Sequence, residues 1–182
     1  MRFRFHISIA GGFSKVVERA KVLGCETIQF FSRNPRGWKY DPLNKKEIEA
    51  FGVSVKSSNL FPLFLHLPYL PNLACEDSKF YKRSIHSIVT DLKRAEQIGA
   101  QCLIIHIGHR MESSEDQAIE AVFQGVNEAF ERVKNSVILL LENTAGQGTE
   151  IGYHFEQLRR IIDGVQEQER MGICLDTAHS FE

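Results

Sequence analysis

Apolar residues in this chain gather in short runs, and a stretch with helical spacing follows each of the first five. The runs begin near residues 3, 27, 62, 102, 137 and 172. Between them, apolar positions recur every three or four residues, which is typical of helices that bury one face. The pattern therefore predicts five helices between six strands, and the expected strands are 2–9, 27–31, 61–65, 102–105, 137–141 and 172–175.

Each predicted helix has an apolar stripe and some have a recognisable start. Asn44 precedes the second helix and Glu47 follows at its third position, so we expect a capping box there. The first stripe begins at Phe13 and extends to Leu23, and the last includes Phe155. Prolines in the segment 67–73 exclude regular structure after the third strand.

The distance between strand starts indicates the fold class. Successive starts lie 24, 35, 40, 35 and 35 residues apart, which is the rhythm of consecutive βα units with parallel, buried strands. We expect one domain, residues 1–182, that forms an α/β TIM-type (β/α)8 barrel with about six of its eight units present. A doubly wound sheet is the alternative, but only a few strands border its switch point.

Four of the predicted strands lead directly into residues of the types that commonly bind metal ions. These residues are His66, His106, Glu142, and Asp176 with His179 three positions later. Carboxyl ends of barrel strands meet at one rim, so these side chains should gather there. Histidine and carboxylate ligands without cysteine suit zinc, manganese or iron, and a carboxylate can bridge two ions. Such a site favours either phosphodiester hydrolysis or isomerisation of a sugar carbonyl, and spacing does not separate the two.

Composition says more about the cellular compartment of the protein than about its function. The formal net charge is −1, so nucleic-acid binding would need a local basic patch or bound cations. The four cysteines form no C-x-x-C pair, which favours a reducing cytoplasm. No apolar run approaches the ~18 residues of a membrane span, so we expect a cytoplasmic protein without a membrane partner.

Several motifs together carry a resemblance to a known family. They are Ser8-x-Ala10-Gly11-Gly12, Asn34-x-Arg36-x-Trp38, His66-x-x-Tyr69 with Asn72-Leu73, Glu142-Asn143-Thr144-Ala145-Gly146-Gln147-Gly148, and Asp176-Thr177-x-His179. The chain resembles bacterial endonuclease IV, the apurinic/apyrimidinic endonucleases, along its whole length and over about two thirds of the family's fold. The resemblance implies an eight-stranded β/α barrel with three zinc ions that cuts the phosphodiester bond 5′ to an abasic site in double-stranded DNA, a step of base excision repair.

The resemblance also implies roles for particular residues. His66, His106 and Glu142 would be the protein ligands of a first zinc, with Glu142 bridging to a second and serving the catalytic step. Asp176 would bind the second zinc and His179 the third. The family's four remaining ligands have no counterpart before residue 182, so we expect one well-liganded zinc here. The sequence Ile107-Gly108-His109 replaces a form that usually contains proline.

Other residues are expected to contact DNA. By resemblance, Arg36 and Trp38 lie in a loop that enters the minor groove, and Tyr69 lies in another such loop. By their chemistry, Arg33 and Lys39 offer further phosphate contacts and Trp38 a stacking face. The solvated-surface alternative remains open for these loops. His86 is expected on a helix surface, and His6 and His109 near the metal ligands.

The sequence leaves two other functions open. A sugar isomerase or epimerase could use the same barrel and metals, although Arg36, Trp38 and Tyr69 have no evident role with a small sugar. A non-catalytic, truncated chain that only binds DNA is the other alternative. Six strands do not close an eight-stranded barrel, so we also expect self-association, or a complementing segment, at the open edges.

Overall fold

The computed structural model describes residues 2, 4–75 and 77–181, and over these it contains six strands, five α-helices and one short 3-10 helix. Strand starts lie within one residue of the predicted positions 27, 62, 102, 137 and 172, whereas the predicted start at residue 3 lies outside the described residues. The elements are β1 (Arg4–Ile7), α1 (Phe13–Val22), β2 (Thr27–Phe31), α2 (Lys45–Ser57), β3 (Leu63–His66), α3 (Ser78–Ile98), β4 (Cys102–His106), α4 (Glu115–Arg132), β5 (Ile138–Glu142), α5 (Phe155–Gly164), η1 (Gln168–Arg170) and β6 (Met171–Cys174).

All six strands form one parallel sheet in the order β1-β2-β3-β4-β5-β6. This sequential order has no reversal point, so the doubly wound alternative is wrong and the barrel-type winding is confirmed. In the described part of the chain, β1 pairs only with β2 and β6 only with β5. The sheet is therefore open at two edges.

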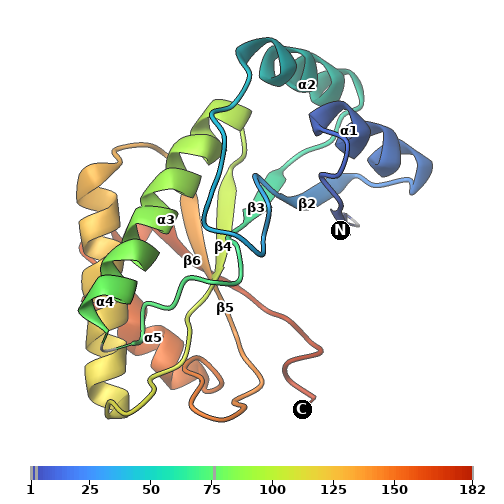
Figure 1. Cartoon of the computed structure of the whole chain (residues 1–182). Helices are drawn as coiled ribbons and strands as arrows, with labels where there is room; N and C mark the ends of the chain where they lie inside the picture. The colour runs from blue at the N-terminus through green and yellow to red at the C-terminus, as the bar shows by residue number, and fades with distance from the viewer. Residues whose placement is uncertain (1, 3, 76, 182) are drawn as a thin grey trace.

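The helices pack in sequence along the outside of the curved sheet. Each helix contacts the next one, and α3, α4 and α5 stand side by side along one face of the sheet in Figure 1. Strand residues such as Leu65, Leu103 and Leu139 are fully buried between the sheet and these helices. One continuous core therefore fixes the strands, and with them the positions of their carboxyl ends.

The structure corrects several predicted boundaries. The first strand ends at Ile7 rather than Ile9, because the chain turns there toward α1. His66, His106 and Glu142 are the last paired residues of their strands instead of the first residues beyond them. Inclusion in the parallel ladder fixes the backbone of all three.

Two residues of the predicted apolar stripes are exposed. Leu23, at the C-terminal cap of α1, is 51% exposed, and Phe155, the first residue of α5, is 59% exposed. Both stand at a helix end. Spacing alone does not show where the neighbouring layer stops.

The predicted capping box of α2 forms only in part. The Asn44 side chain accepts a hydrogen bond from the Glu47 backbone N–H, as expected. The Glu47 carboxylate, however, accepts from the backbone N–H of Phe13 at 2.8 Å. Glu47 therefore caps the neighbouring helix α1, a contact between residues 34 positions apart.

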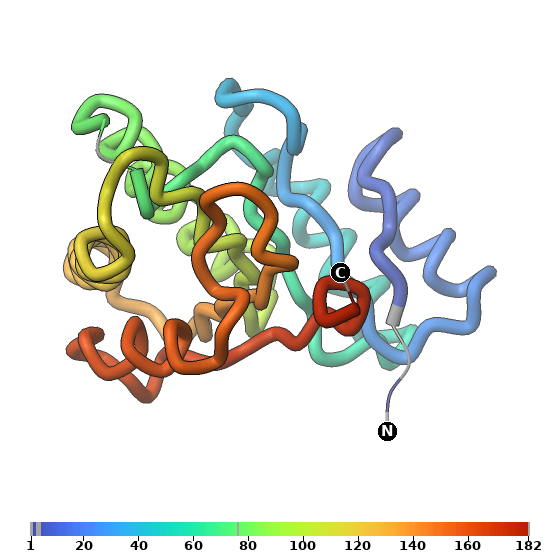
Figure 2. Tube along the Cα trace, turned by 90° about the horizontal axis from the view of Figure 1, so that it is seen from below, coloured from blue at the N-terminus to red at the C-terminus, as the bar shows by residue number. Residues whose placement is uncertain are grey.

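The carboxyl ends of the strands gather at one rim of the sheet. His106 lies opposite Glu142 in the pairing of β4 with β5, and His66 lies opposite Ile104 in the pairing of β3 with β4. Figure 2 looks at this rim, with the loop after β5 in orange and the C-terminal turn in red toward the viewer. Among the described residues, every helix is too short or too polar to cross a membrane.

Candidate metal centre

Three predicted ligands converge from three neighbouring strands. The Glu142 Oε2 atom lies 3.1 Å from His66 Nε2 and 3.5 Å from His106 Nε2. The ligand atoms of these three residues lie within 4.8 Å of one another, close enough to surround one ion. His66 and Glu142 are buried and His106 is half-buried, so the group opens toward solvent on the His106 side.

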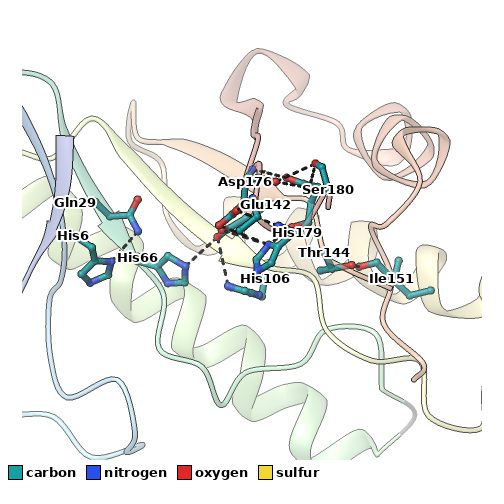
Figure 3. A network of polar contacts seen from close by, with 12 residues as sticks. His6, Gln29, His66, His106, Glu142, Thr144, Ile151, Asp176, His179 and Ser180 are labelled. Atoms are coloured by element: carbon teal, nitrogen blue, oxygen red, sulfur yellow. Dashed lines mark hydrogen bonds and ion pairs between the residues drawn. The ribbon is translucent and has the colours of Figure 1, made fainter. Parts of the chain in front are cut away.

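The orientation of His66 suits a metal ligand. Its Nδ1 atom donates to the carbonyl oxygen of Leu67 at 2.6 Å. That bond assigns a proton to Nδ1, and Figure 3 shows the other ring nitrogen, Nε2, joined to Glu142. The two-histidine, one-carboxylate donor set fits zinc, manganese or iron.

A second group shares Glu142 with the first. Glu142, Asp176 and His179 also offer ligand atoms within 4.8 Å of one another. The Glu142 Oε1 atom lies 3.9 Å from His179 Nδ1, which in turn lies 3.8 Å from Asp176 Oδ2. One carboxylate oxygen thus faces the histidine pair and the other faces the second group (Figure 3). This arrangement would allow the carboxylate to bridge two ions.

The second group holds one histidine where the first holds two. His179 Nδ1 lies 2.8 Å from the carbonyl oxygen of Asn143 and donates a hydrogen bond to it. A nitrogen that holds a proton cannot ligate a metal through the same atom, so His179 would ligate through Nε2 unless this bond breaks. In both groups a backbone carbonyl thus orients a histidine, Leu67 for His66 and Asn143 for His179.

The electrostatics of the rim favour ligand forms near neutral pH. Burial lowers the pKa of His106, more than the Glu142 carboxylate raises it, while His66 and His179 lower it further. A neutral imidazole is the form that binds a metal. Burial raises the pKa of Asp176, but hydrogen bonds from the backbone N–H groups of His179 and Ala178 outweigh it, so this pKa lies below its ordinary value.

Asn143 holds the second group in place, a role that the sequence did not reveal. This buried side chain donates to the Asp176 carbonyl at 3.0 Å and accepts from the Asp176 backbone N–H at 2.6 Å. It also donates to Ser180 Oγ at 3.2 Å. Its place directly after Glu142 in the quoted motif was the only available signal.

A second asparagine joins the loops after β3 and β4. Asn72 accepts from the backbone N–H of His109 at 3.1 Å and donates to the His109 carbonyl at 2.9 Å. Gly108 makes this contact possible, because a Cβ atom there would lie 2.1 Å from Asn72 Oδ1 and its φ of +112° disfavours other residues. A cavity of about 550 Å³ lies beside these loops, and its lining includes Tyr69, His106 and Thr144.

The residues expected to contact DNA lie near this rim. Arg36 is exposed, and Tyr69 is 60% exposed with its ring centre 5.9 Å from that of His66. The Tyr69 backbone N–H donates to the Pro35 carbonyl at 3.1 Å, so the two loops are joined. Trp38 is half-buried and packs against helix α3, which leaves only part of its ring for a stacking contact.

Arg33 is not available for a phosphate, contrary to expectation. Its side chain is buried and pairs with Asp91, at 2.6 Å between Nη2 and Oδ2. Lys39 is exposed. His86 is on the surface as expected, and the His6 ring centre lies 6.1 Å from that of His66. His109 Nε2 lies 4.0 Å from Glu150 Oε1, and both residues line the same cavity as His106.

A curved sheet of consecutive βα units, with candidate metal ligands at the carboxyl ends of its strands, defines a TIM-type barrel protein with a candidate metal centre. The chain belongs to the family described as Xylose isomerase-like TIM barrel, which it matches over residues 17–182. This family assignment agrees with the strand order and with the position of the rim.

Within that family the chain is similar to endonuclease IV proteins. It is 42% identical over 177 residues to the probable endonuclease 4 of Methanoculleus marisnigri, covering 97% of this chain and 63% of that relative. The crystal structure of endonuclease IV from Thermus thermophilus matches with a TM-score of 0.84 at 31% identity, covering all of this chain and 64% of that one. A D-tagatose 3-epimerase-like protein matches with a TM-score of 0.77 at 16% identity, which shows a shared fold alone. The chain thus spans slightly less than two thirds of these endonuclease relatives.

Proposed function

We propose that this chain provides six βα units of a zinc-dependent DNA repair endonuclease that hydrolyses the phosphodiester bond 5′ to an abasic site. The observation that carries the proposal is the Glu142 carboxylate, whose two oxygens face two separate ligand groups. Clustered zinc ions supply Lewis acidity that activates water and stabilises charge on phosphate oxygens. Sequence similarity to proteins named probable endonuclease 4 supports the same reaction class.

The residues of this chain would prepare the rim for that chemistry. His66 and His106 offer ring nitrogens, the Leu67 carbonyl orients His66, and Glu142 supplies the carboxylate of the first group. Asn143 holds Asp176 beside Glu142. These contacts fix ligand positions before an ion binds, which reduces the cost of organising the site.

Nucleic acid would approach over the loops after β2 and β3. Arg36 and Lys39 are exposed cations for phosphates, and Tyr69 presents a ring beside the histidines. The net charge of −1 means that such local contacts and the bound ions must supply the attraction for DNA.

The test uses a labelled duplex with a single abasic site and the chain loaded with zinc. We expect weak, zinc-dependent cleavage on the 5′ side of the site, leaving a 3′ hydroxyl group, and no cleavage of the intact duplex. Glu142→Gln should lower the rate by at least about 10–100-fold, the range caused even by changes around metal ligands. Glu150→Gln is the matched control, because Glu150 lies outside both ligand groups.

The same preparation should be tested on a panel of ketoses. Activity on sugars alone would replace the endonuclease by an isomerase or epimerase, for which the 550 Å³ cavity beside His106 is large enough. Binding of zinc and of abasic duplex without any cleavage would instead favour a non-catalytic DNA-binding chain.

A further inference from the structure

The loop 32–41, between β2 and α2, is closed at its base by a single side chain from α3. Arg94 donates from Nη2 to the Ser32 carbonyl at 2.6 Å and from Nη1 to the Asp41 carbonyl at 2.9 Å. Its Nε atom donates to Ser32 Oγ at 2.9 Å. One guanidinium thus binds the first and the last residue of the loop.

Asp91 supplies the negative charge beside this clamp. Its buried carboxylate accepts from Ser32 Oγ at 2.5 Å and from Arg33 Nε and Nη2 at 3.0 and 2.6 Å. The Tyr40 ring lies near both guanidinium groups, with its centre 5.3 Å from Arg33 and 5.8 Å from Arg94. Two arginines, one aspartate and one tyrosine therefore fix the two ends of the loop.

The middle of the loop lies along the same face of α3. Trp38 packs with its ring centre 5.4 Å from that of Phe80 and 4.3 Å from the Arg83 guanidinium. The contacting α3 residues include Phe80, Arg83, Ser87, Asp91 and Arg94, and their spacing of three or four residues places them on one side of the helix. His86 and Thr90, on the same side, contact the Tyr40 hydroxyl. Figure 1 shows the chain between β2 and α2 running beside α3.

This arrangement fixes a loop rather than adding much stability. Buried ion pairs lose much of their attraction to the cost of removing charges from water, so their main contribution is a defined geometry. Arg94 is buried, and this burial lowers the pKa of its guanidinium, while the Asp91 carboxylate opposes the shift. Within the held loop, Arg36 and Lys39 remain exposed, and Pro35 is bonded to Tyr69 beside the metal ligands.

We propose that Arg94 is a positioning residue for nucleic-acid binding: it closes the base of loop 32–41 and so fixes the place from which Arg36 reaches a phosphate. This inference rests on the proposed function, because it assumes that the loop meets DNA. Arg94 itself is buried, so it would act on the nucleic acid through the loop.

The test compares Arg94→Lys with Arg170→Lys. A lysine keeps the charge but cannot span two carbonyl groups with one planar head. Arg170 is an equally buried arginine that donates to the Val133 carbonyl at 3.0 Å and stacks 3.9 Å from the Phe130 ring, away from the loop. Both variants should lower thermal stability, and only Arg94→Lys should release the loop.

Loop order has a built-in reporter, because Trp38 is the single tryptophan of the sequence. We expect acrylamide quenching of its fluorescence to rise about twofold or more in Arg94→Lys, and trypsin cleavage after Arg36 and Lys39 to accelerate about tenfold, as a local opening permits. Arg170→Lys, measured equally far below its own melting temperature, should match the original protein in both measurements.

The DNA measurement separates positioning from general destabilisation. Arg94→Lys should weaken binding of zinc-loaded chain to an abasic duplex about tenfold, and Arg36→Ala should do the same by removing one phosphate contact. Because Arg94 acts through Arg36, the double variant should bind within about twofold of Arg36→Ala alone.

The possible outcomes all bear on the proposal. Equal quenching in Arg94→Lys and Arg170→Lys would show that Arg94 does not close the loop. A loosened loop with unchanged DNA affinity would show that the loop's position does not matter for binding. A double variant whose loss of DNA affinity equals the sum of the two single losses would show that Arg94 does not act through Arg36. If the original chain binds no abasic duplex, the proposed function fails at that point, while the fluorescence arm still decides whether Arg94 closes the loop.

Discussion

Glu142 is the residue on which both candidate ion sites depend. It is the only acidic member of the first group and is shared by the second. The two groups differ in their ligands, since the first has two histidines, whereas the second has one and shares Glu142 with the first. These contacts give different expectations for the first and second ion.

The isolated chain should retain one zinc ion much more tightly than any second. His66, His106 and Glu142 form a three-ligand set that leaves an open position, whereas Asp176 and His179 need Glu142 as well. Metal analysis by mass spectrometry after dialysis measures the number of ions retained. Three zinc ions per monomeric chain would contradict the ligand count.

Glu142→Gln should weaken the tight site most, because it removes the charge of the first group at constant shape. We expect an affinity loss of at least about 10–100-fold in a chelator competition. Glu150→Gln controls for a nearby carboxylate that belongs to neither group. Equal affinities for zinc in the two variants would show that Glu142 does not bind the ion.

Tyr81 should make folding stability fall at alkaline pH. Burial, followed by the negative charge of Glu128, raises the pKa of its phenol to about 12, and its hydroxyl donates to the Ala121 carbonyl at 2.6 Å. The unfolded phenol ionises near pH 10, so this contribution to stability is complete below that pH and is lost as the pH rises toward 12. Urea unfolding at several pH values measures it.

The matched variant for this test is Tyr81→Phe. It should be less stable at neutral pH, because it lacks the hydrogen bond, and should lose less stability between pH 10 and 12 than the original protein. An identical pH dependence in both proteins would show that Tyr81 is not the group responsible.

At the scale of elements, neighbouring loops hold the rim together. Asn72 ties the loop after β3 to the loop after β4, and Asn143 ties the end of β5 to the turn after β6. Each tie is one side chain bonded to the backbone of the next unit. The ligands therefore depend on contacts between units as well as on their own strands.

Gly108→Ala should destabilise the protein more than Gly99→Ala. Both glycines have positive φ, +112° and +80°, but only at Gly108 would a Cβ atom meet Asn72 Oδ1, at 2.1 Å, and nothing lies within 4 Å at Gly99. Backbone strain alone costs about 1–3 kcal/mol, and the clash adds to it at Gly108. Urea unfolding gives both free energies, and equal costs would show that the contact with Asn72 is easily displaced.

At the scale of the whole molecule, the open sheet leaves two strand edges and apolar surface exposed. Phe5 in β1 is 52% exposed and Ile173 in β6 is 47% exposed. Each unpaired backbone group that also loses water costs about 1–3 kcal/mol. Domains of this size are stable by only about 5–15 kcal/mol, so a few such groups could cancel the stability of the folded monomer.

The chain in solution should self-associate through these edges or need a complementing segment, and should cleave abasic DNA poorly alone. Phe5→Lys should reduce the association, because a charge on an edge strand opposes pairing, whereas Val22→Lys, on the 87% exposed Val22 of α1, should not. Size-exclusion chromatography with light scattering measures the mass. A monodisperse monomer with full activity would refute the prediction.

Local pattern determined the order and type of the elements. Apolar runs and helical stripes predicted six parallel strands and five helices, and the tendency of strand ends to share a rim predicted that His66, His106 and Glu142 would meet. These features follow from residues close together in the sequence and from the winding of βα units. The pattern did not show at which residue burial stops along a helix, since Phe155 belongs to an apolar stripe but is exposed at the start of α5.

Only the tertiary structure decided which distant partner several polar side chains bind. Arg33 looked like a phosphate ligand but reaches Asp91, 58 positions away, and Glu47 caps α1 instead of its own helix. Asn143 holds Asp176, and the two oxygens of Glu142 face different ligand groups. The physical reason is that burial forces a polar group to find a partner, and packing decides which distant group is within reach.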